Sequence, residues 1–479
     1  MTVNVIPEPQ SVRILSGNTV FSLTRLAEFY CDKKSEKAKE SFFEFASNCF
    51  GLEFVGTGKE KLTFCAVSGL PKEGYRLTVS ENSVRIEGGG EAGIFWGVQT
   101  LIQLLIQNDC SLCALEIEDF PRTEKRGLML DCASWFFTPE AVKLVLDAMA
   151  FHKLNVFHWK LSGDMGWRLE LFDNLLLSQI GSMRAYTGIG KMPHSGYYSQ
   201  KDVKDILDYA EKRCIAVVPE LDFPDHTAAA VCAYPSLSCF GEETAVPTRF
   251  GDTSACLCLG KKEASDFVLS VLDETAELFG SGYIHLGGGR SKKSQRSTCP
   301  QCLEKMKELG TDESGLLKDF FSRAAAHLEE RGVRVIVRSD EPGLIPTGAV
   351  FEKCSDGEDS AAPVIDAFCR LSLPHGEMSV EKCYEHALFP LSIGAEAVLD
   401  TEYAPTIKRA GELLFPRLGA FCENVWTKKE SRSFADFLLK IDSYFSFLDL
   451  LGIYHSNKKY AFPGKARSGF EKLRRHFGK

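Results

Sequence analysis

GLMLDCASWFFTPE, residues 127–140, begins as a strand and ends as the first turn of a helix. Its apolar run GLMLD (127–131) predicts a short strand that closes on an acid. Thr138 then suits an N-cap and Pro139 the first helical position. NVFHW (155–159) predicts the next strand, so residues 127–159 contain one βα unit and the start of another.

The same alternation continues along the chain. Ser199 and Asp202 have a capping-box-like spacing at the start of a helix that leads to a strand at 215–220. Four or five such units over about 300 residues favour a (β/α)₈ barrel, class α/β, above a doubly wound sheet. No G-x-G-x-x-G follows the first strand, which gives a dinucleotide fold little support. Active sites of barrels lie at the C-terminal strand ends, and the residues that directly follow predicted strands are Asp131, Asp222, His226 and Arg290.

Residues 1–120 predict a small α+β domain ahead of the barrel. Alternating runs at 75–79 and 83–87 indicate a hairpin, and 93–105 indicates an apolar helix packed on it. We expect the barrel over 121–455 and a basic tail over 456–479, interpreted as a solvated terminal helix in preference to a nucleic-acid or acidic-lipid segment. Strands beyond residue 345 are only weakly indicated.

Composition excludes several classes of protein. With 56 Lys plus Arg against 65 Asp plus Glu, the net charge is -9, which disfavours a general nucleic-acid binder. No run of 18 apolar residues predicts a membrane span. The N-terminus lacks a basic segment followed by an apolar one, so we expect no signal peptide and favour a cytoplasmic location. The oligomeric state and any protein partner stay open.

The 17 cysteines are scattered and odd in number, which favours reduced, partly buried thiols. Cys299-Pro300-Gln301-Cys302 is a lone C-x-x-C, and no second pair follows at finger-like spacing. We therefore expect a loop cysteine pair ahead of a helix, with no metal. No His/Asp/Glu cluster at metal spacing is visible either, so no cofactor is predicted.

The motifs, taken in order, resemble glycoside hydrolase family 20, the β-N-acetylhexosaminidases. The resemblance covers nearly the whole chain and rests on short matches: EGY (73–75), GVQTL (97–101), RGLMLD (126–131), HKLNVFHW (152–159), GWR (166–168), GYY (196–198), PELDFP (219–224), AYP (233–235), EY (402–403) and LFPR (414–417). It implies the same two-domain fold.

Two adjacent positions depart from the family at the centre of its chemistry. There the strand matching YIHL (283–286) continues Gly-Gly-Asp-Glu, whereas this chain continues Gly287-Gly288-Gly289-Arg290. The family's substrate supplies its own acetamido nucleophile, while the Glu donates a proton and the Asp orients the acetamido group. Gly289 has no side chain, and Arg290 stays protonated and cannot act as a general acid. Losing general acid–base help alone costs roughly 10²–10⁴ in rate.

The resemblance also suggests a remodelled pocket. Sugar-facing tryptophans of the family fall at Ser339, Lys353 and Asp400, and an Arg-His pair falls at Ser134-Trp135. The groups that hold the acetamido moiety fall at Arg370 and Ser372. Arg126 and Glu402 are expected to hold sugar hydroxyls, with His226 behind the catalytic Glu. The full set of candidate pocket residues is Arg126, Asp164, Asp222, Asp225, His226, Arg290, Asp340, Asp400 and Glu402.

Three functions remain open. The first is a catalytically inactive family member that binds a carbohydrate or regulates, including a version without ligand in which Arg290 pairs with Asp225 or Asp400. The second is a repurposed glycosidase for a charged or anionic sugar, with Asp225 beside His226 as the first pair to inspect. The third is residual β-N-acetylhexosaminidase activity. His158 and Trp159 are expected to pack the barrel rather than bind.

Overall fold

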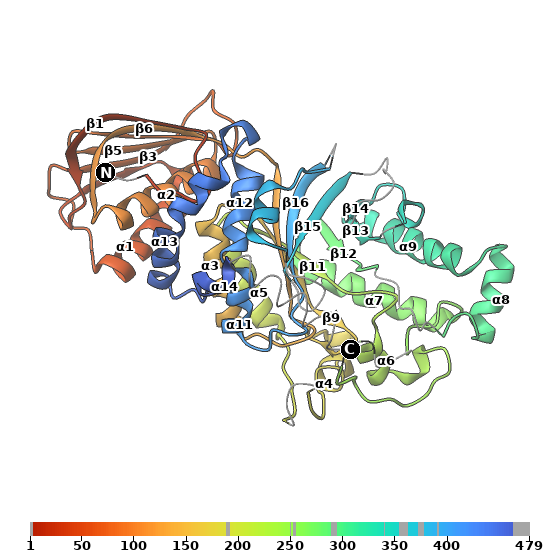
Figure 1. Cartoon of the computed structure of the whole chain (residues 1–479). Coiled ribbons are helices and arrows are strands. Elements are labelled where there is room, and N and C mark those ends of the chain that lie inside the picture. Colours follow the sequence, from red (N-terminus) through yellow and green to blue (C-terminus); the bar gives the residue numbers. More distant parts are fainter. Residues whose placement is uncertain are drawn as a thin grey trace.

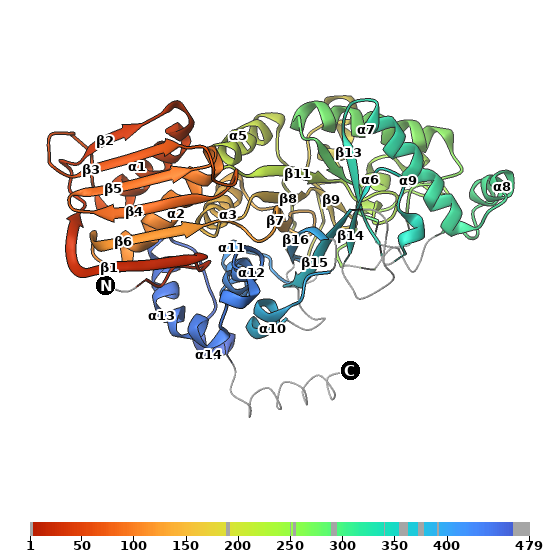
Figure 2. The ribbon, with the colours of Figure 1, turned by 90° about the horizontal axis from the view of Figure 1, so that it is seen from above.

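The computed structural model describes residues 3–187, 192–249, 251, 255–288, 295–339, 341–353, 363–371, 378–389 and 392–462. The N-terminal domain is a six-stranded sheet in the order β1-β6-β4-β5-β3-β2, with α1 and α2 against one face (Figures 1 and 2). The predicted hairpin is confirmed as the antiparallel pair β4–β5. The elements are β1 (Ser11–Ser22), β2 (Glu28–Cys31), η1 (Lys33–Ser35), α1 (Glu36–Phe50), β3 (Lys61–Ala66), β4 (Tyr75–Ser80), β5 (Ser83–Gly88), α2 (Glu91–Gln107) and β6 (Ser111–Asp119).

Eight parallel strands close into a barrel in the order β11-β12-β13-β14-β15-β16-β7-β8, which confirms the predicted fold class. The barrel occupies the middle of the molecule, next to the N-terminal sheet (Figure 2). Its strands are β7 (Lys125–Asp131), β8 (Val156–Lys160), β11 (Ala216–Glu220), β12 (Tyr283–His285), β13 (Arg334–Arg338), β14 (Val350–Lys353), β15 (Val364–Arg370) and β16 (Ser392–Leu399). A two-stranded ribbon, β9 (Ser162–Gly163) with β10 (Gly166–Trp167), follows β8.

Two helices of the barrel domain begin where the local sequence signals predict. Thr138 caps α3 by accepting from the Ala141 N–H, and Ser199 and Asp202 form a full capping box on α5. The helices of the barrel domain are α3 (Pro139–Phe151), α4 (Leu176–Gln179), α5 (Gln200–Glu211), α6 (Ala228–Ala233), α7 (Lys262–Phe279), α8 (Pro300–Leu309), α9 (Glu313–Glu329), α10 (Val380–Glu385), α11 (Ile407–Leu414), α12 (Arg417–Trp426), α13 (Phe434–Leu450) and α14 (Lys458–Ala461). Short 3₁₀ turns are η2 (Phe172–Asn174), η3 (Pro235–Leu237), η4 (Pro342–Leu344) and η5 (Lys429–Ser431).

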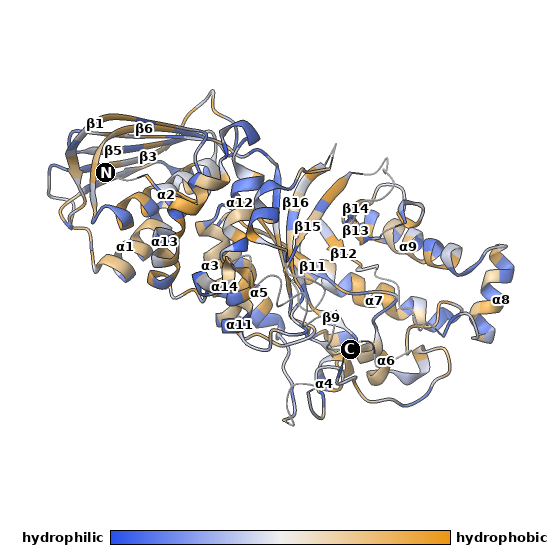
Figure 3. Ribbon diagram, viewed as in Figure 1, coloured by the Kyte–Doolittle hydropathy of each residue, from blue (hydrophilic) through white to orange (hydrophobic). Residues whose placement is uncertain are grey.

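The hydrophobic core runs through both domains. The α2 helix is part of this core: its residues from Gly93 to Leu105 are all buried, and it is coloured mainly hydrophobic in Figure 3. The α13 helix returns to the N-terminal domain, where Lys440 Nζ lies 2.6 Å from Glu8 Oε2. Within the described part of the chain, no helix has the length and apolar character needed to cross a membrane.

Candidate functional site at the barrel mouth

Two adjacent strands bring opposite charges to the C-terminal mouth of the barrel. Lys160 ends β8 and Asp222 follows β11, with Lys160 Nζ 2.8 Å from Asp222 Oδ2. Burial raises the pKa of the Asp222 carboxyl, although the charge of Lys160 opposes that rise. Its Oδ1 has no hydrogen-bond partner among the described residues. The backbone of Gly287 covers this atom, because a Cβ on Gly287 would lie 2.0 Å from it. Asp222 is therefore enclosed and presents no open carboxylate to a ligand.

A carboxylate–imidazole pair lies beside this ion pair. His226 Nδ1 is 2.9 Å from Asp164 Oδ2, and the second oxygen of Asp164 accepts from the Ala228 N–H. His226 has a φ of +53°, a conformation that L residues adopt only where the surroundings impose it. Burial lowers its pKa, but the hydrogen bond to Asp164 and the charge of Asp222 outweigh that and raise it to about 9. At neutral pH this imidazole is a cation that donates hydrogen bonds and is a poor general base.

Two further expected carboxylates, Asp225 and Asp400, are paired with arginines. Asp225 Oδ1 is 2.6 Å from Nη1 of the fully buried Arg296. Asp400 lies 3.3 Å from Arg370 at the exposed rim. Although Asp225 and His226 are neighbours in sequence, the first pairs with Arg296 and the second with Asp164, so the structure does not join them in one catalytic pair.

An aromatic side chain occupies the corner of the mouth between β7 and the segment after β16. Trp135 is 8% exposed, and its indole N–H donates to the Glu402 carbonyl at 3.0 Å. The guanidinium of Arg184 lies 4.9 Å from the centroid of the Trp135 ring. The His194 ring packs edge-to-face against Trp135, with 4.9 Å between the ring centroids. Trp135 is therefore fixed by a cation–π contact and a hydrogen bond. The expected role of the Glu402 carboxylate stays a prediction.

The expectation for Arg126 is wrong. This residue lies at the start of β7, hence at the N-terminal end of the barrel, opposite the mouth. It is fully buried, ion-paired with Glu73 of the N-terminal domain, and its guanidinium lies 5.0 Å from the Trp426 ring centroid. Arg126 fastens the two domains together and cannot reach a ligand at the mouth.

Charged residues also fill the barrel beneath the mouth. His158 lies between Glu220 at 2.7 Å and Glu396 at 2.9 Å, and His285 lies 2.5 Å from Glu352. Burial lowers the pKa of His158, but both glutamates raise it, to about 10. His158, His285 and Glu352 approach to metal-like distances, yet each already has a partner: His158 lies between two glutamates, and Glu352 contacts both His285 and Arg338. We interpret them as a charged barrel core, which confirms that His158 packs inside the barrel.

Several predicted positions cannot be placed. Gly289, Arg290, Asp340 and Ser372 lie outside the described residues. After β12 the described chain ends at Gly288, directly before position 289. Gly287 and Gly288 both have positive φ, +69° and +111°. The residues that the structure does bring together near the mouth are Asp164, Asp222, Asp225 and His226 from the β8–β11 side, with Asp400 and Glu402 on the β16 side.

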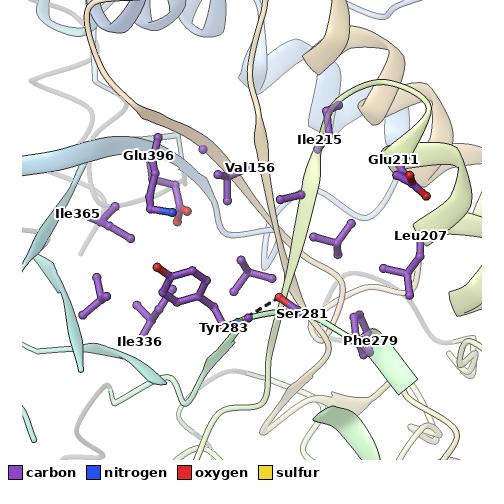
Figure 4. Close-up of a pocket in the computed structure, with 18 of the residues that line it drawn as sticks. Val156, Leu207, Glu211, Ile215, Phe279, Ser281, Tyr283, Ile336, Ile365 and Glu396 are labelled. Carbon is purple, nitrogen blue, oxygen red and sulfur yellow. Dashed lines mark hydrogen bonds between the residues drawn. The ribbon is translucent and has the colours of Figure 1, made fainter. Parts of the chain in front are cut away.

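A cavity of about 520 Å³ lies at the opposite end of the barrel. Figure 4 shows Tyr283 surrounded by apolar side chains, among them Val156, Ile336 and Ile365. These residues stand at or near the beginnings of their strands. The cavity is therefore remote from the mouth, where barrel enzymes carry their chemistry, and we do not assign the candidate site to it.

Comparison with known proteins settles the family. The model "Glycosyl hydrolase family 20, catalytic domain" matches residues 124–342, and "Glycosyl hydrolase family 20, domain 2" matches residues 2–120. This chain belongs to glycosyl hydrolase family 20. A β-hexosaminidase of Porphyromonas gingivalis is 33% identical over 84% of this chain and 58% of its own length. One of Akkermansia muciniphila is 34% identical over 56% of this chain and 55% of its own length. The family 20 chain thus spans rather more than half the length of these curated relatives.

Solved family 20 structures superpose on almost the entire chain. The exo-β-N-acetylglucosaminidase of Vibrio harveyi, solved in complex with N-acetylglucosamine, has a TM-score of 0.85 at 25% identity and covers 95% of this chain and 78% of its own. The β-N-acetylhexosaminidase of Bacteroides fragilis has a TM-score of 0.81 at 26% identity, covering 94% and 96%.

Proposed function

We propose that this family 20 protein binds a carbohydrate-related ligand at its barrel mouth without hydrolysing N-acetylhexosaminides by the family's route. The observation that carries the proposal is the sequence Gly289-Arg290, where the family resemblance expects Asp-Glu. Neither residue can donate a proton to a leaving oxygen near neutral pH.

The described part of the mouth supports this proposal. Asp222 is enclosed, Asp225 is paired with Arg296, and Asp164 holds a protonated His226. These carboxylates are engaged in holding neighbouring cations, which leaves them poorly suited to replace the missing acid. The retained His226 cation suits a ligand with an acceptor or anionic group, such as a sugar carboxylate, sulfate or phosphate.

A second candidate function is hydrolysis of terminal N-acetylhexosamine. It is favoured by the similarity itself, since both curated relatives are β-hexosaminidases and the Vibrio harveyi structure holds N-acetylglucosamine. This alternative needs an acid other than the pair at 289 and 290. Asp222 is the carboxyl to test, because burial raises its pKa and a raised carboxyl pKa is what a general acid requires. This role requires the Gly287 backbone that covers Asp222 to shift, so that the carboxyl can reach a leaving oxygen.

The deciding experiment measures hydrolysis of 4-nitrophenyl N-acetyl-β-glucosaminide and -galactosaminide. We expect no turnover by the natural chain, and measurable turnover when Gly289→Asp is combined with Arg290→Glu. The matched control combines Gly289→Asn with Arg290→Gln, which restores size without the carboxyls. Turnover by the natural chain that Asp222→Asn abolishes would establish the second function.

Binding is measured separately by calorimetry with N-acetylglucosamine and N-acetylglucosamine 6-phosphate. We expect the anionic sugar to bind more tightly, and we expect His226→Gln to weaken it about tenfold, the loss of one charge-assisted hydrogen bond. If neither sugar binds at millimolar concentration, the binding part of the proposal is wrong.

A further inference from the structure

Four cysteines that are distant in sequence meet in one buried cluster, which we call the tetracysteine cluster: Cys239, Cys258, Cys299 and Cys302. Their sulfur atoms all lie within 4.8 Å of one another. Cys239 follows η3, Cys258 precedes α7, and the other two belong to the first turn of α8. The expectation that Cys299 and Cys302 lack companion ligands is therefore wrong, because those companions lie singly, 41 and 60 residues before Cys299.

The spacing of the sulfurs matches a tetrahedral metal site better than disulfides. Cys258 Sγ lies 3.6 Å from Cys302 Sγ and 3.7 Å from Cys299 Sγ, and Cys239 Sγ lies 4.0 Å from Cys302 Sγ. A tetrahedron with Zn–S bonds of about 2.3 Å has sulfur–sulfur edges of about 3.8 Å. A disulfide needs sulfurs at about 2.05 Å and can join only two of them, whereas Cys258 has two sulfur neighbours at nearly equal distance.

The backbone around the cluster is arranged to support negative sulfur. Cys299 is the N-cap of α8 and Cys302 lies in its first turn, where the helix dipole and free N–H groups favour thiolates. Gly260 presses directly on this turn, since a Cβ there would meet the Gln301 carbonyl carbon at 2.3 Å.

We propose that the tetracysteine cluster binds one zinc ion as a closed, structural Cys₄ site. Four thiolates around Zn²⁺ leave no open position for substrate, so the site would stabilise structure rather than perform chemistry. The resulting excess negative charge has a nearby counterion in Arg296, a fully buried cation that donates to the Leu257 carbonyl beside Cys258.

The position of the cluster indicates what the metal would hold in place. It ties the start of α7 to the start of α8, the helix farthest from the N-terminal sheet in both views (Figures 1 and 2). Arg296 donates to the Leu257 carbonyl next to the cluster and to Asp225 at the mouth. A zinc ion here would anchor the described chain around Arg296 and, through that residue's ion pair, the Asp225 side chain at the mouth.

The first test is the zinc content of the untagged full-length protein, purified in reducing buffer and measured by mass spectrometry of the metal. We expect about one zinc per chain. Cys258→Ser and Cys302→Ser are each expected to lower this below about 0.2. Cys49→Ser, a half-buried cysteine on α1 far from the cluster, is the matched control and should keep the full zinc content.

A second measurement on the natural chain covers the case in which the variants fail to fold. A mercurial thiol reagent is added stepwise while a coloured indicator reports released zinc, and we expect release to follow the reaction of four thiols. Replacement of zinc by Co²⁺ should give the sulfur-to-metal absorption of a tetrahedral thiolate site. The proposal is overturned if the natural chain binds no metal in the presence of equimolar ZnCl₂. It is also overturned if the measured mass of the natural chain is lower by four hydrogens, because that loss would show that the four thiols form two disulfides. Because these readouts need no sugar, they are independent of the proposed function.

Discussion

His226 is the residue whose charge state most affects the mouth. Its folded-state pKa of about 9 lies above the ordinary 6.5 because of Asp164 and Asp222. The stability that its charge contributes is therefore complete below pH 6.5 and is lost as the pH rises through 9. We predict that Asp164→Asn returns the pKa toward 6.5 and removes up to about 3 kcal/mol of pH-dependent stability.

The measurement is an NMR titration of the His226 ring protons, together with urea unfolding at both ends of that pH range. The matched control is Asp273→Asn, which removes the carboxylate partner of His327 on the helical surface. An unchanged His226 titration in Asp164→Asn would show that this carboxylate does not control its charge.

Gly287 sits where no other residue fits. It has a φ of +69°, and a Cβ would lie 2.0 Å from Asp222 Oδ1. We predict that Gly287→Ala lowers the free energy of unfolding by about 1–3 kcal/mol from backbone strain and more from the clash. Gly280→Ala is the control, because Gly280 has a φ of +56° but open space around it. Equal losses in guanidinium unfolding of the two variants would contradict the close contact with Asp222.

Sequence reasoning at this scale succeeded for local signals and failed for long-range ones. Thr138 and Ser199 predict the starts of their helices correctly, because an N-cap side chain accepts from a backbone N–H only three residues further along the chain. Arg126 was misplaced although Asp131, five positions later, marks the C-terminal end of the same strand. The pairing of Asp164 with His226 depends on the fold, since neither residue's neighbours in sequence reveal the other.

At the scale of elements, α5 offers a clean test of a helix start. The Ser199 hydroxyl accepts from the Asp202 N–H at 3.1 Å, while the Asp202 carboxylate accepts from the Ser199 N–H at 2.9 Å. We predict that Ser199→Ala costs about 1 kcal/mol of stability and that Ser199→Thr costs much less, because threonine keeps the acceptor. Urea unfolding midpoints measure both, and an equal loss in the two variants would mean that the hydroxyl does not cap the helix.

The strands that sequence reasoning indicated only weakly share a physical feature. Each of the last three barrel strands carries a buried acid that interrupts its apolar run, namely Glu352 in β14, Asp366 in β15 and Glu396 in β16. Glu352 is ion-paired with Arg338 of the adjacent strand β13 and lies 2.5 Å from His285 of β12. A sequence pattern predicts that an acidic residue is exposed unless its buried partners are known. Strands whose buried side includes ion pairs are therefore not recognised from their apolar residues alone. The tetracysteine cluster is not predictable from spacing, because Cys239 and Cys258 come singly from two distant segments to join the pair at the start of α8.

At the scale of the whole molecule, Asp119 joins the two domains. This fully buried carboxylate lies 2.8 Å from Nζ of Lys153, which follows the C-cap of α3, and it accepts from the Tyr75 hydroxyl at 2.6 Å and the Trp426 indole at 2.9 Å. Burial lowers the pKa of Lys153, and Asp119 opposes that decrease. The sheet, the barrel and the C-terminal helices therefore share one electrostatic contact, whose members come from distant parts of the sequence.

We predict that Lys153→Met lowers stability by about 3–5 kcal/mol, because the Asp119 carboxylate is left buried without its cation. Calorimetry should show one cooperative transition in the natural chain and a separate, earlier melting of the N-terminal sheet in the variant. Lys143→Met is the matched control, since it removes an exposed ion pair with Asp205 and should cost less than about 1 kcal/mol. Adding Asp119→Asn to Lys153→Met should recover part of the loss, because the uncompensated charge is then gone. No recovery would assign the loss to packing rather than charge, and equal losses at positions 143 and 153 would contradict the role of this contact in joining the domains.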